Sequence, residues 1–488
     1  MLRWVLLLSL LMMQTACDSQ TSKNRPESSL LKVAAQSQVK DNVEEPAFEP
    51  LVATDLLNKP TAVYRFETTA EALSIWRRAS LPPTLLLLSN NPQLTPVPEE
   101  FRKKTRILIN NANAKDLALA TTDRNPAPMI LPGMAVDTAI RNRWFKELAW
   151  ALPLRDPSLE VNLEKFTEQL SQAGFASDNE ISSILETGRT FHGTLRDTAF
   201  RAAALPLLQE LQQPVIVHID LSYFQPLYKN EISTPLLDIV FNTLTTLKKM
   251  HLETLAVTIS YGHLDSQISL DVRFLGDILA YLIEDPTRLD QPIPTNWQRQ
   301  RDALYLANFF QKDKVRELYE AQEKDAPEAA WVKFNLYRSA AEHKEGTKAL
   351  DYLAEAVALD PIFALEYQDL SNTAYEKQRP DEALRMLELA AEVFHEDPFL
   401  KLQMAQLANQ LGEKEQALEL LNKIRNLQWS EVYYPGMQQY LAELTTFVQT
   451  GGQPPSKKKT EKGNERGEVE LIIPRIDPAR QQTLHSSQ

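Results

Sequence analysis

The chain has 488 residues, and with 43% hydrophobic and 24% charged residues its composition is globular, enough for two or three domains. Its formal charge of -13 argues against nucleic acid as a partner, because such proteins need a clustered basic surface to displace counterions. The single cysteine excludes an internal disulfide framework and any metal site made of several thiolates.

The N-terminus has the layout of an export signal. One basic residue precedes an apolar run over residues 4–13, which is too short to cross a bilayer as a stable helix but typical of a signal-peptide core. Two small residues then precede Cys17. This arrangement resembles the lipobox of bacterial lipoproteins, although Gln14 stands where that motif usually has leucine. The resemblance implies a signal peptide over residues 1–16 and acylation of Cys17, for instance with palmitate.

A lipid on Cys17 would hold the chain at the periplasmic side of the cell envelope, because two or three acyl chains anchor a protein stably. Asp18 resembles the inner-membrane retention signal of enterobacterial lipoproteins. An ordinary secretory signal cut near Ala16 and an uncleaved signal anchor are the alternatives. Residues 17–59 are polar and lack hydrophobic periodicity, so we expect a disordered tether with a reach of about 35 Å.

Residues 60–295 alternate short apolar runs with amphipathic stretches, which predicts an α/β domain with a largely parallel sheet. The expected strands are 84–88, 105–108, 215–219 and 256–260. The expected helices are 69–78, 161–173, 194–211, 234–250 and 271–284.

Within this domain, residues 214–224 (PVIVHIDLSYF) look like the strand-end motif of arginase/deacetylase-fold proteins. The likeness is greatest to a poorly characterised ureohydrolase-like family. Residues 85–94 stand where that family has a strand ending in Asp-x-His-x-Asp, and residues 260–274 resemble its last strand and the helix after it. The resemblance implies an arginase-like three-layer fold around a mostly parallel sheet.

Metal-dependent members of such families hold Mn or Zn with carboxylates and a histidine at strand ends, and the metal activates a water. Here the first cluster reads Ser89-Asn90-Asn91, and in the second Asp220 remains but Ser222 stands at the next ligand position. One carboxylate lacks the charge and ligand number of a divalent site. The sequence therefore predicts a pseudoenzyme with no cofactor and no catalytic residue.

Two His-x-Asp pairs leave a second hypothesis open. His218 with Asp220, and His263 with Asp265, lie near expected strand ends, where residues i and i+2 face the same side. Four such ligands could hold Mn or Zn in a metal-dependent amidohydrolase or amidinohydrolase. A histidine at a strand end often bonds only to a backbone carbonyl, which is the alternative for both.

Residues 296–449 repeat with a period of 34. Leucine and alanine recur in register at Ala349-Leu350, Ala383-Leu384 and Ala417-Leu418, followed by Leu353, Leu387 and Leu421. This period and these residues look like tetratricopeptide repeats, because the small alanine lets paired helices approach and the leucines fill the groove. The resemblance implies an all-α superhelix, with a degenerate repeat at 297–327 and a closing helix at 430–449.

Such superhelices usually bind a peptide or protein on their concave face, so we expect a protein partner. Two alternatives stay open: the array only braces the α/β domain, or both pack as one unit of a larger envelope complex. Residues 450–488 contain Pro454-Pro455 and three lysines at 457–459, and we expect a flexible tail. The favoured hypothesis is a membrane-anchored periplasmic scaffold.

Overall fold

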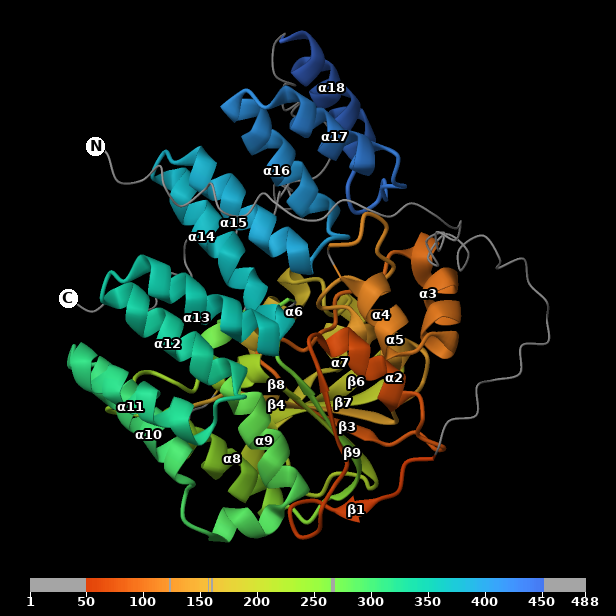
Figure 1. The fold of residues 1–488 in the computed structure, drawn as a ribbon. Coiled ribbons are helices and arrows are strands. Elements are labelled where there is room, and N and C mark those ends of the chain that lie inside the picture. Colours follow the sequence, from red (N-terminus) through yellow and green to blue (C-terminus); the bar gives the residue numbers. More distant parts are fainter. Residues whose placement is uncertain (1–49, 123, 157, 159–160, 265–267, 452–488) are drawn as a thin grey trace, which may run out of the picture. The chain divides into compact units, whose positions relative to one another are not determined.

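A mixed nine-stranded sheet forms the centre of the first half of the structure, a computed structural model that describes residues 50–122, 124–156, 158, 161–264 and 268–451 (Figure 1). The expected signal peptide, most of the tether, the tail, Cys17, Asp18 and Asp265 lie outside these ranges. The strands are β1 (Thr54–Asp55), β2 (Val63–Phe66), β3 (Thr84–Leu88), β4 (Glu147–Leu152), β5 (Leu185–Thr187), β6 (Thr190–Leu195), β7 (Thr198–Ala204), β8 (Val215–Asp220) and β9 (Glu253–Ser260).

The sheet has the order β1-β9-β8-β3-β4-β7-β6-β5, and β2 also pairs with β9. Neighbours among β2, β9, β8, β3, β4 and β7 are parallel, whereas β1, β5 and β6 add antiparallel pairs at the margins. The predicted α/β class with a largely parallel sheet is therefore confirmed. Strand β1 lies within residues 17–59, so the sheet begins inside the segment expected to be tether.

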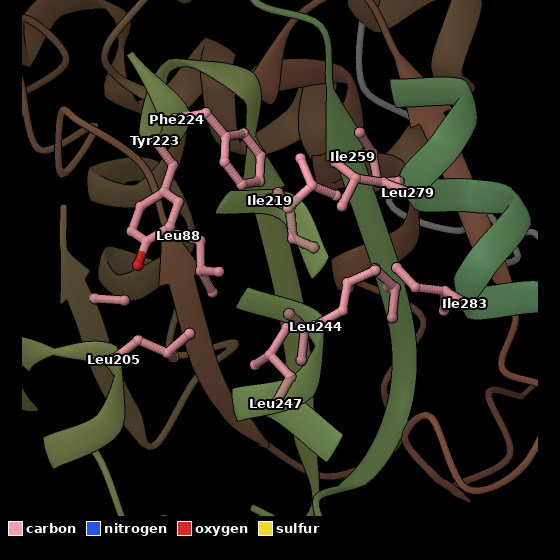
Figure 2. Packing of buried hydrophobic residues seen from close by; sticks show 14 of the residues in the cluster. Leu88, Leu205, Ile219, Tyr223, Phe224, Leu244, Leu247, Ile259, Leu279 and Ile283 are labelled. Carbon is pink, nitrogen blue, oxygen red and sulfur yellow. The ribbon is translucent and has the colours of Figure 1, made fainter. Parts of the chain in front are cut away.

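Helices cover both faces of the sheet. Leu86 and Leu88 of β3 belong to one hydrophobic cluster and Leu85 and Leu87 to the other, because successive side chains of a strand point to opposite faces. Figure 2 shows the first cluster, in which α8 (Leu236–Lys249) and α9 (Phe274–Glu284) pack on the sheet. The second face carries residues of η1 (Thr69–Ala72), α2 (Leu73–Trp76), α3 (Glu99–Asn111), α4 (Ala114–Thr121), α5 (Ala135–Arg141) and α6 (Leu163–Gln172).

Two expected elements of this domain are wrong. Residues 105–108, expected as a strand, lie in α3, where only Thr105 and Ile109 are buried. Residues 194–211, expected as a helix, contain the end of β6, all of β7 and η2 (Leu205–Leu207). Arg196 and Asp197 connect β6 to β7 with φ values of 48° and 60°, as in a two-residue hairpin turn of left-handed residues. The remaining short elements are α7 (Asp178–Ser183), η3 (Leu221–Phe224), η4 (Leu270–Val272) and η5 (Pro286–Asp290).

From residue 295 to residue 450, a stretch described without a gap, the chain forms an array of paired helices (Figure 1). The pairs are α10 (Thr295–Ala307) with α11 (Lys312–Asp325), α12 (Ala330–Glu342) with α13 (Gly346–Leu359), α14 (Leu365–Glu376) with α15 (Pro380–Val393), and α16 (Pro398–Leu411) with α17 (Lys414–Arg425). Helix α18 (Met437–Thr450) follows, and η6 (Pro361–Ala364) precedes α14. None of the helices that the structure describes is long and apolar enough to span a bilayer.

The 34-residue period is visible in burial and in backbone geometry. Most of the alanines and leucines that defined it in the sequence are buried, namely Ala349, Leu353, Ala383, Leu384, Leu387, Ala417 and Leu421. Leu350 and Leu418 are half-buried. The turns within the four pairs place a left-handed residue every 34 positions, at Phe310, Lys344, Gln378 and Gly412. In α11 buried Val315 and Tyr319 occupy the positions of the repeated alanine and leucine. This explains why the sequence of the first pair, α10 and α11, departs from the repeat pattern. The predicted array of helical repeats is thus confirmed.

The array is joined to the α/β domain at three consecutive turns between its pairs. Arg273 bonds to Asp360 at 2.6 Å, and Arg124 bonds to Asp397 at 2.9 Å. At the third turn the backbone N–H of Ser430 donates to the carbonyl of Pro126 at 2.8 Å. From residue 50 on, the described chain is one compact unit.

The first helices of the pairs also contact this domain. Trp297 of α10 and Trp331 of α12, 34 positions apart, pack against the core formed by α8 and α9. Their rings lie 5.5 Å from Tyr281 and 5.8 Å from Phe274, respectively. Arg338 of α12 forms an ion pair with Asp271. Part of the face that the first helices present is therefore occupied by the chain's own α/β domain.

Arg273 is the most enclosed of these links, with a side chain only 9% exposed. Its terminal nitrogens donate to both carboxylate oxygens of Glu67, at 2.7 and 3.0 Å, while Nε donates to Asp360. The guanidinium lies over the ring of Tyr261, 4.0 Å from the centroid. The ring fits there because Gly276 has no side chain: a Cβ at that position would lie 2.2 Å from the ring.

Replacing Arg273 by methionine should lower the free energy of unfolding by about 3 kcal/mol, because it leaves two carboxylates without their cation. Urea denaturation followed by circular dichroism measures this change. The matched control is Arg65→Met, which breaks the pair with Asp277 but has a side chain 52% exposed, so it should cost less than about 1 kcal/mol. Equal effects of the two substitutions would contradict the role given to Arg273.

Candidate functional site

The strand order places a candidate site at the carboxyl ends of β3 and β8. From β3 the chain continues to β4 on one side, whereas from β8 it continues to β9 on the other, although β3 and β8 are neighbours. In parallel α/β sheets, ligand crevices form at such a switch point. The residues that follow these strands are Ser89-Asn90-Asn91 and Leu221-Ser222, which contain the two sequence clusters compared with metal ligands.

Hydrogen bonds within the chain connect the two strand ends. The hydroxyls of Ser89 and Ser222 lie 3.4 Å apart, and the backbone N–H of Asn90 donates to the Ser222 hydroxyl at 3.2 Å. The indole N–H of Trp150, on β4, donates to the carbonyl of Ser89 at 2.8 Å. Neutral groups therefore bond to each other at these two strand ends, where the resemblance to arginase-fold proteins would place metal-binding carboxylates.

Asp220 is fully buried at the end of β8 and accepts three hydrogen bonds. Its Oδ1 accepts from the backbone N–H of Ser222 at 2.9 Å. Its Oδ2 accepts from the hydroxyls of Ser260 at 2.5 Å and Thr69 at 3.4 Å. Burial raises the pKa of Asp220 although these hydrogen bonds lower it, so the fold disfavours the charged carboxylate.

His218 lies on the same face of β8 as Asp220 and is also fully buried. Its Nδ1 is 2.9 Å from the hydroxyl of Thr258, and its Nε2 is 3.2 Å from that of Ser260 and 3.3 Å from that of Thr69. Burial lowers the pKa of His218 to about 3, so the imidazole is neutral at pH 7.

The segment Thr69–Trp76 covers this network. The Trp76 indole donates to the hydroxyl of Thr258 at 3.1 Å, and its ring meets the His218 ring edge-on at 5.3 Å. Ser260 touches both His218 and Asp220, yet the other nitrogen of His218 faces Thr258 instead of a carboxylate, unlike the order of a catalytic triad. A serine at 0% exposure cannot meet a substrate in this conformation.

The second His-x-Asp pair is placed elsewhere. His263 is buried after β9, and its Nδ1 lies 2.7 Å from the carbonyl oxygen of Ile268. This is the bond to a backbone carbonyl that a histidine at a strand end often makes, and Asp265 is outside the described residues. Within the described ranges, no three His, Cys, Asp or Glu side chains are grouped so as to hold a metal ion. The donors near Asp220, a single carboxylate among neutral hydroxyls, do not fit a Mn or Zn site.

Sequence reasoning missed the partners of His218 and Asp220. Thr258 and Ser260 alternate with buried Val257 and Ile259 on β9, and this alternation is a signal for a polar stripe on one face of the sheet. Thr69 lies 149 positions before His218, and no local pattern connects the two. In the pairing of β8 with β9, His218 lies opposite Thr258 and Asp220 lies opposite Ser260. This pairing brings the polar side chains of the two strands together.

Comparison with known proteins gives little further guidance. No protein-family model matches the sequence, and no curated protein is similar to it. A crystal structure of MamA protein is 16% identical over 32% of this chain and 82% of that chain, with a TM-score of 0.22. A second crystal structure of MamA is 16% identical over 32% of this chain and 93% of that chain, with a TM-score of 0.21. Likeness at this level carries no argument about function.

The network predicts a specific acid sensitivity. The folded state lowers the pKa of His218 to about 3 from 6.5, so below pH 6.5 the unfolded chain binds a proton that the folded chain does not. The free energy of unfolding should therefore decrease as the pH falls from 6.5 towards 3. The loss should approach about 1.4 kcal/mol per pH unit within that window. Urea titrations at pH 7, 6 and 5 measure it, with His218→Gln as the comparison.

In the His218→Gln protein this part of the pH dependence should vanish. Asp220 is present in both proteins, so its raised pKa, which has the opposite effect, cancels in the comparison. Parallel pH profiles of the two proteins would show that His218 does not titrate in this way.

Proposed function

We propose that this protein is a lipid-anchored component of the cell envelope that acts as a protein-interaction scaffold. A tetratricopeptide-like array and a non-catalytic, ureohydrolase-like α/β domain would together form its binding surface. The observation that carries the proposal is the regular attachment of the array, turn after turn, through Asp360, Asp397 and Ser430. Helical arrays of this period typically bind proteins, and an array held at three consecutive turns would lose less conformational entropy when a partner docks.

The non-catalytic assignment is supported by how the site residues are used. The three hydrogen bonds to Asp220 and the contacts of His218 would have to be broken before either side chain could serve a metal or a substrate. The ring of His218 also meets the ring of Trp76 edge-on, with the ring centroids 5.3 Å apart. Stoichiometric binding of Mn or Zn that Asp220→Ala abolishes would overturn this half of the proposal and favour the amidohydrolase alternative.

The exposed sides of α13 and α15 suggest the chemistry of the partner. Carboxylates outnumber basic groups among their exposed charged residues, which are Lys348, Asp351, Glu355, Asp381, Arg385, Glu388 and Glu392. These are the second helices of two consecutive pairs, whereas the first helices are partly occupied by the α/β domain. We therefore propose that the partner presents a basic segment to this surface.

Reversing Glu388 and Glu392 together to lysine should weaken capture of that partner about tenfold, because it replaces attraction by repulsion. The measurement is affinity capture from detergent-solubilised membranes, quantified by mass spectrometry at two salt concentrations. The matched control reverses Glu164 and Glu168 of α6, which have the same spacing and are also exposed. A partner captured equally by both variants would contradict the assigned surface.

The anchor has its own test. Cells that produce the protein and are fed labelled palmitate should incorporate the label, and Cys17→Ser should abolish incorporation because this is the only cysteine in the chain. Mass spectrometry of the mature N-terminal peptide should find it beginning at Cys17. An unlabelled protein, or one that retains residues 1–16, would refute acylation without affecting the proposed partner surface.

A further inference from the structure

The first helical pair of the array has a polar core. Gln300 of α10, Gln322 of α11 and Asn335 of α12 are buried, with exposed fractions of 1%, 0% and 6%. We call these three side chains the amide core. One, two and three periods after Gln322, the equivalent positions are all apolar and fully buried, namely Ala356, Ala390 and Ile424. The first pair therefore joins its neighbour through amides at a position where the later pairs have hydrocarbon.

Hydrogen bonds within the amide core leave two of its atoms unpaired. Oε1 of Gln300 accepts from Nε2 of Gln322 at 3.3 Å and from Nδ2 of Asn335 at 2.9 Å. Nε2 of Gln322 also donates to the carbonyl of Asn296 at 2.8 Å. Among the residues that the structure describes, buried Nε2 of Gln300 and Oε1 of Gln322 have no hydrogen-bond partner. Exchanging oxygen and nitrogen in either glutamine would bring like groups together, so its orientation is set by these neighbours.

Apolar burial around the amide core is small. Val315 and Tyr319 are, with Gln322, the residues that α11 buries. They belong to a cluster with Ala303 and Leu336 that is separate from the larger cluster joining the later pairs. In contrast, α15 of the third pair buries five apolar residues: Ala383, Leu384, Met386, Leu387 and Ala390. Because hydrophobic burial is the main favourable term in packing, α11 is held less firmly than α15.

Ion pairs supply further contacts between α11 and the helices that follow. The guanidinium of Arg316 donates to both carboxylate oxygens of Glu345, at 2.7 and 2.8 Å. Nζ of Lys333 lies 2.6 Å from a carboxylate oxygen of Glu323. These pairs are partly exposed, and such pairs contribute little stability and weaken as salt is added. The contact of α11 therefore depends largely on polar groups, for which water and salt compete.

We propose that α11 separates from α12 in a local opening of the folded protein, while the later pairs stay packed. Opening lets water pair with the two unsatisfied amide atoms, which are costly to leave buried. Elements with little apolar burial open locally before the whole fold unfolds. The base of α10 stays in place, because Trp297 packs against the core formed by α8 and α9. Opening uncovers Tyr319 and Leu336, and the inference does not depend on the proposed scaffold function because it concerns the chain alone.

Hydrogen–deuterium exchange of the full chain, read by mass spectrometry, tests this. Amides of α11 should exchange about tenfold faster than those of α15, because they open locally. The combined change Gln300→Met, Gln322→Met and Asn335→Leu replaces the amides by apolar groups of similar shape. It should slow exchange in α11 about tenfold, because no unpaired amide remains in the closed arrangement. The matched control is Gln416→Met on α17, whose amide donates to Glu388 at the surface, and it should leave α11 unchanged.

Added salt gives a second reading on the unaltered chain. Raising the ionic strength from about 0.1 M to about 1 M should speed exchange in α11 several-fold and leave α15 unchanged, because the ion pairs of Arg316 and Lys333 are screened. The exchange of α15 also reports whether the variant chains are folded. Exchange in α11 that is as slow as in α15 and insensitive to salt would overturn the proposal. So would a folded triple variant in which α11 exchanges as fast as in the unaltered chain.

Discussion

The arrangement of the molecule depends on the two-sided ion pair of Arg273. This guanidinium is removed from water, and a charge in that position is tolerated only when its hydrogen bonds are satisfied. Glu67, just after β2, and Asp360, in a turn of the array, supply the acceptors from two distant parts of the chain. One cation therefore couples the sheet to the array, and the ion pair of Arg338 with Asp271 joins the same two parts with its cation on the array side.

The fold was predictable from sequence where burial imposes a period. The helical array could be predicted because alanine and leucine recur every 34 positions. Strand β3 could be predicted because it is apolar on both faces, as strands covered by helices are. The hairpin of β6 and β7 could not, because its left-handed turn uses Arg196 and Asp197 without a glycine, and the alanines that follow favour a helix. A tertiary pairing there outweighs local propensity.

The candidate site, too, could be predicted from the sequence only in part. The i, i+2 spacing was enough to place His218 and Asp220 on one face of a strand, but it could not reveal which residues oppose that face. Thr258 and Ser260 arrive through strand pairing, and Thr69 arrives through the segment that closes over the sheet. The same two titratable side chains can serve as metal ligands or as buried hydrogen-bonding groups, and the neighbours decide between these roles.

The contact between Arg273 and the helical array depends on the absence of a side chain at Gly276. The ring of Tyr261 fills the volume that a side chain at this position would occupy, and the guanidinium of Arg273 lies over the same ring. A single methyl group on α9 would displace the ring, and with it the surface that supports the guanidinium. One of the links between sheet and array therefore depends on a glycine of α9, which leaves room for the ring that supports Arg273.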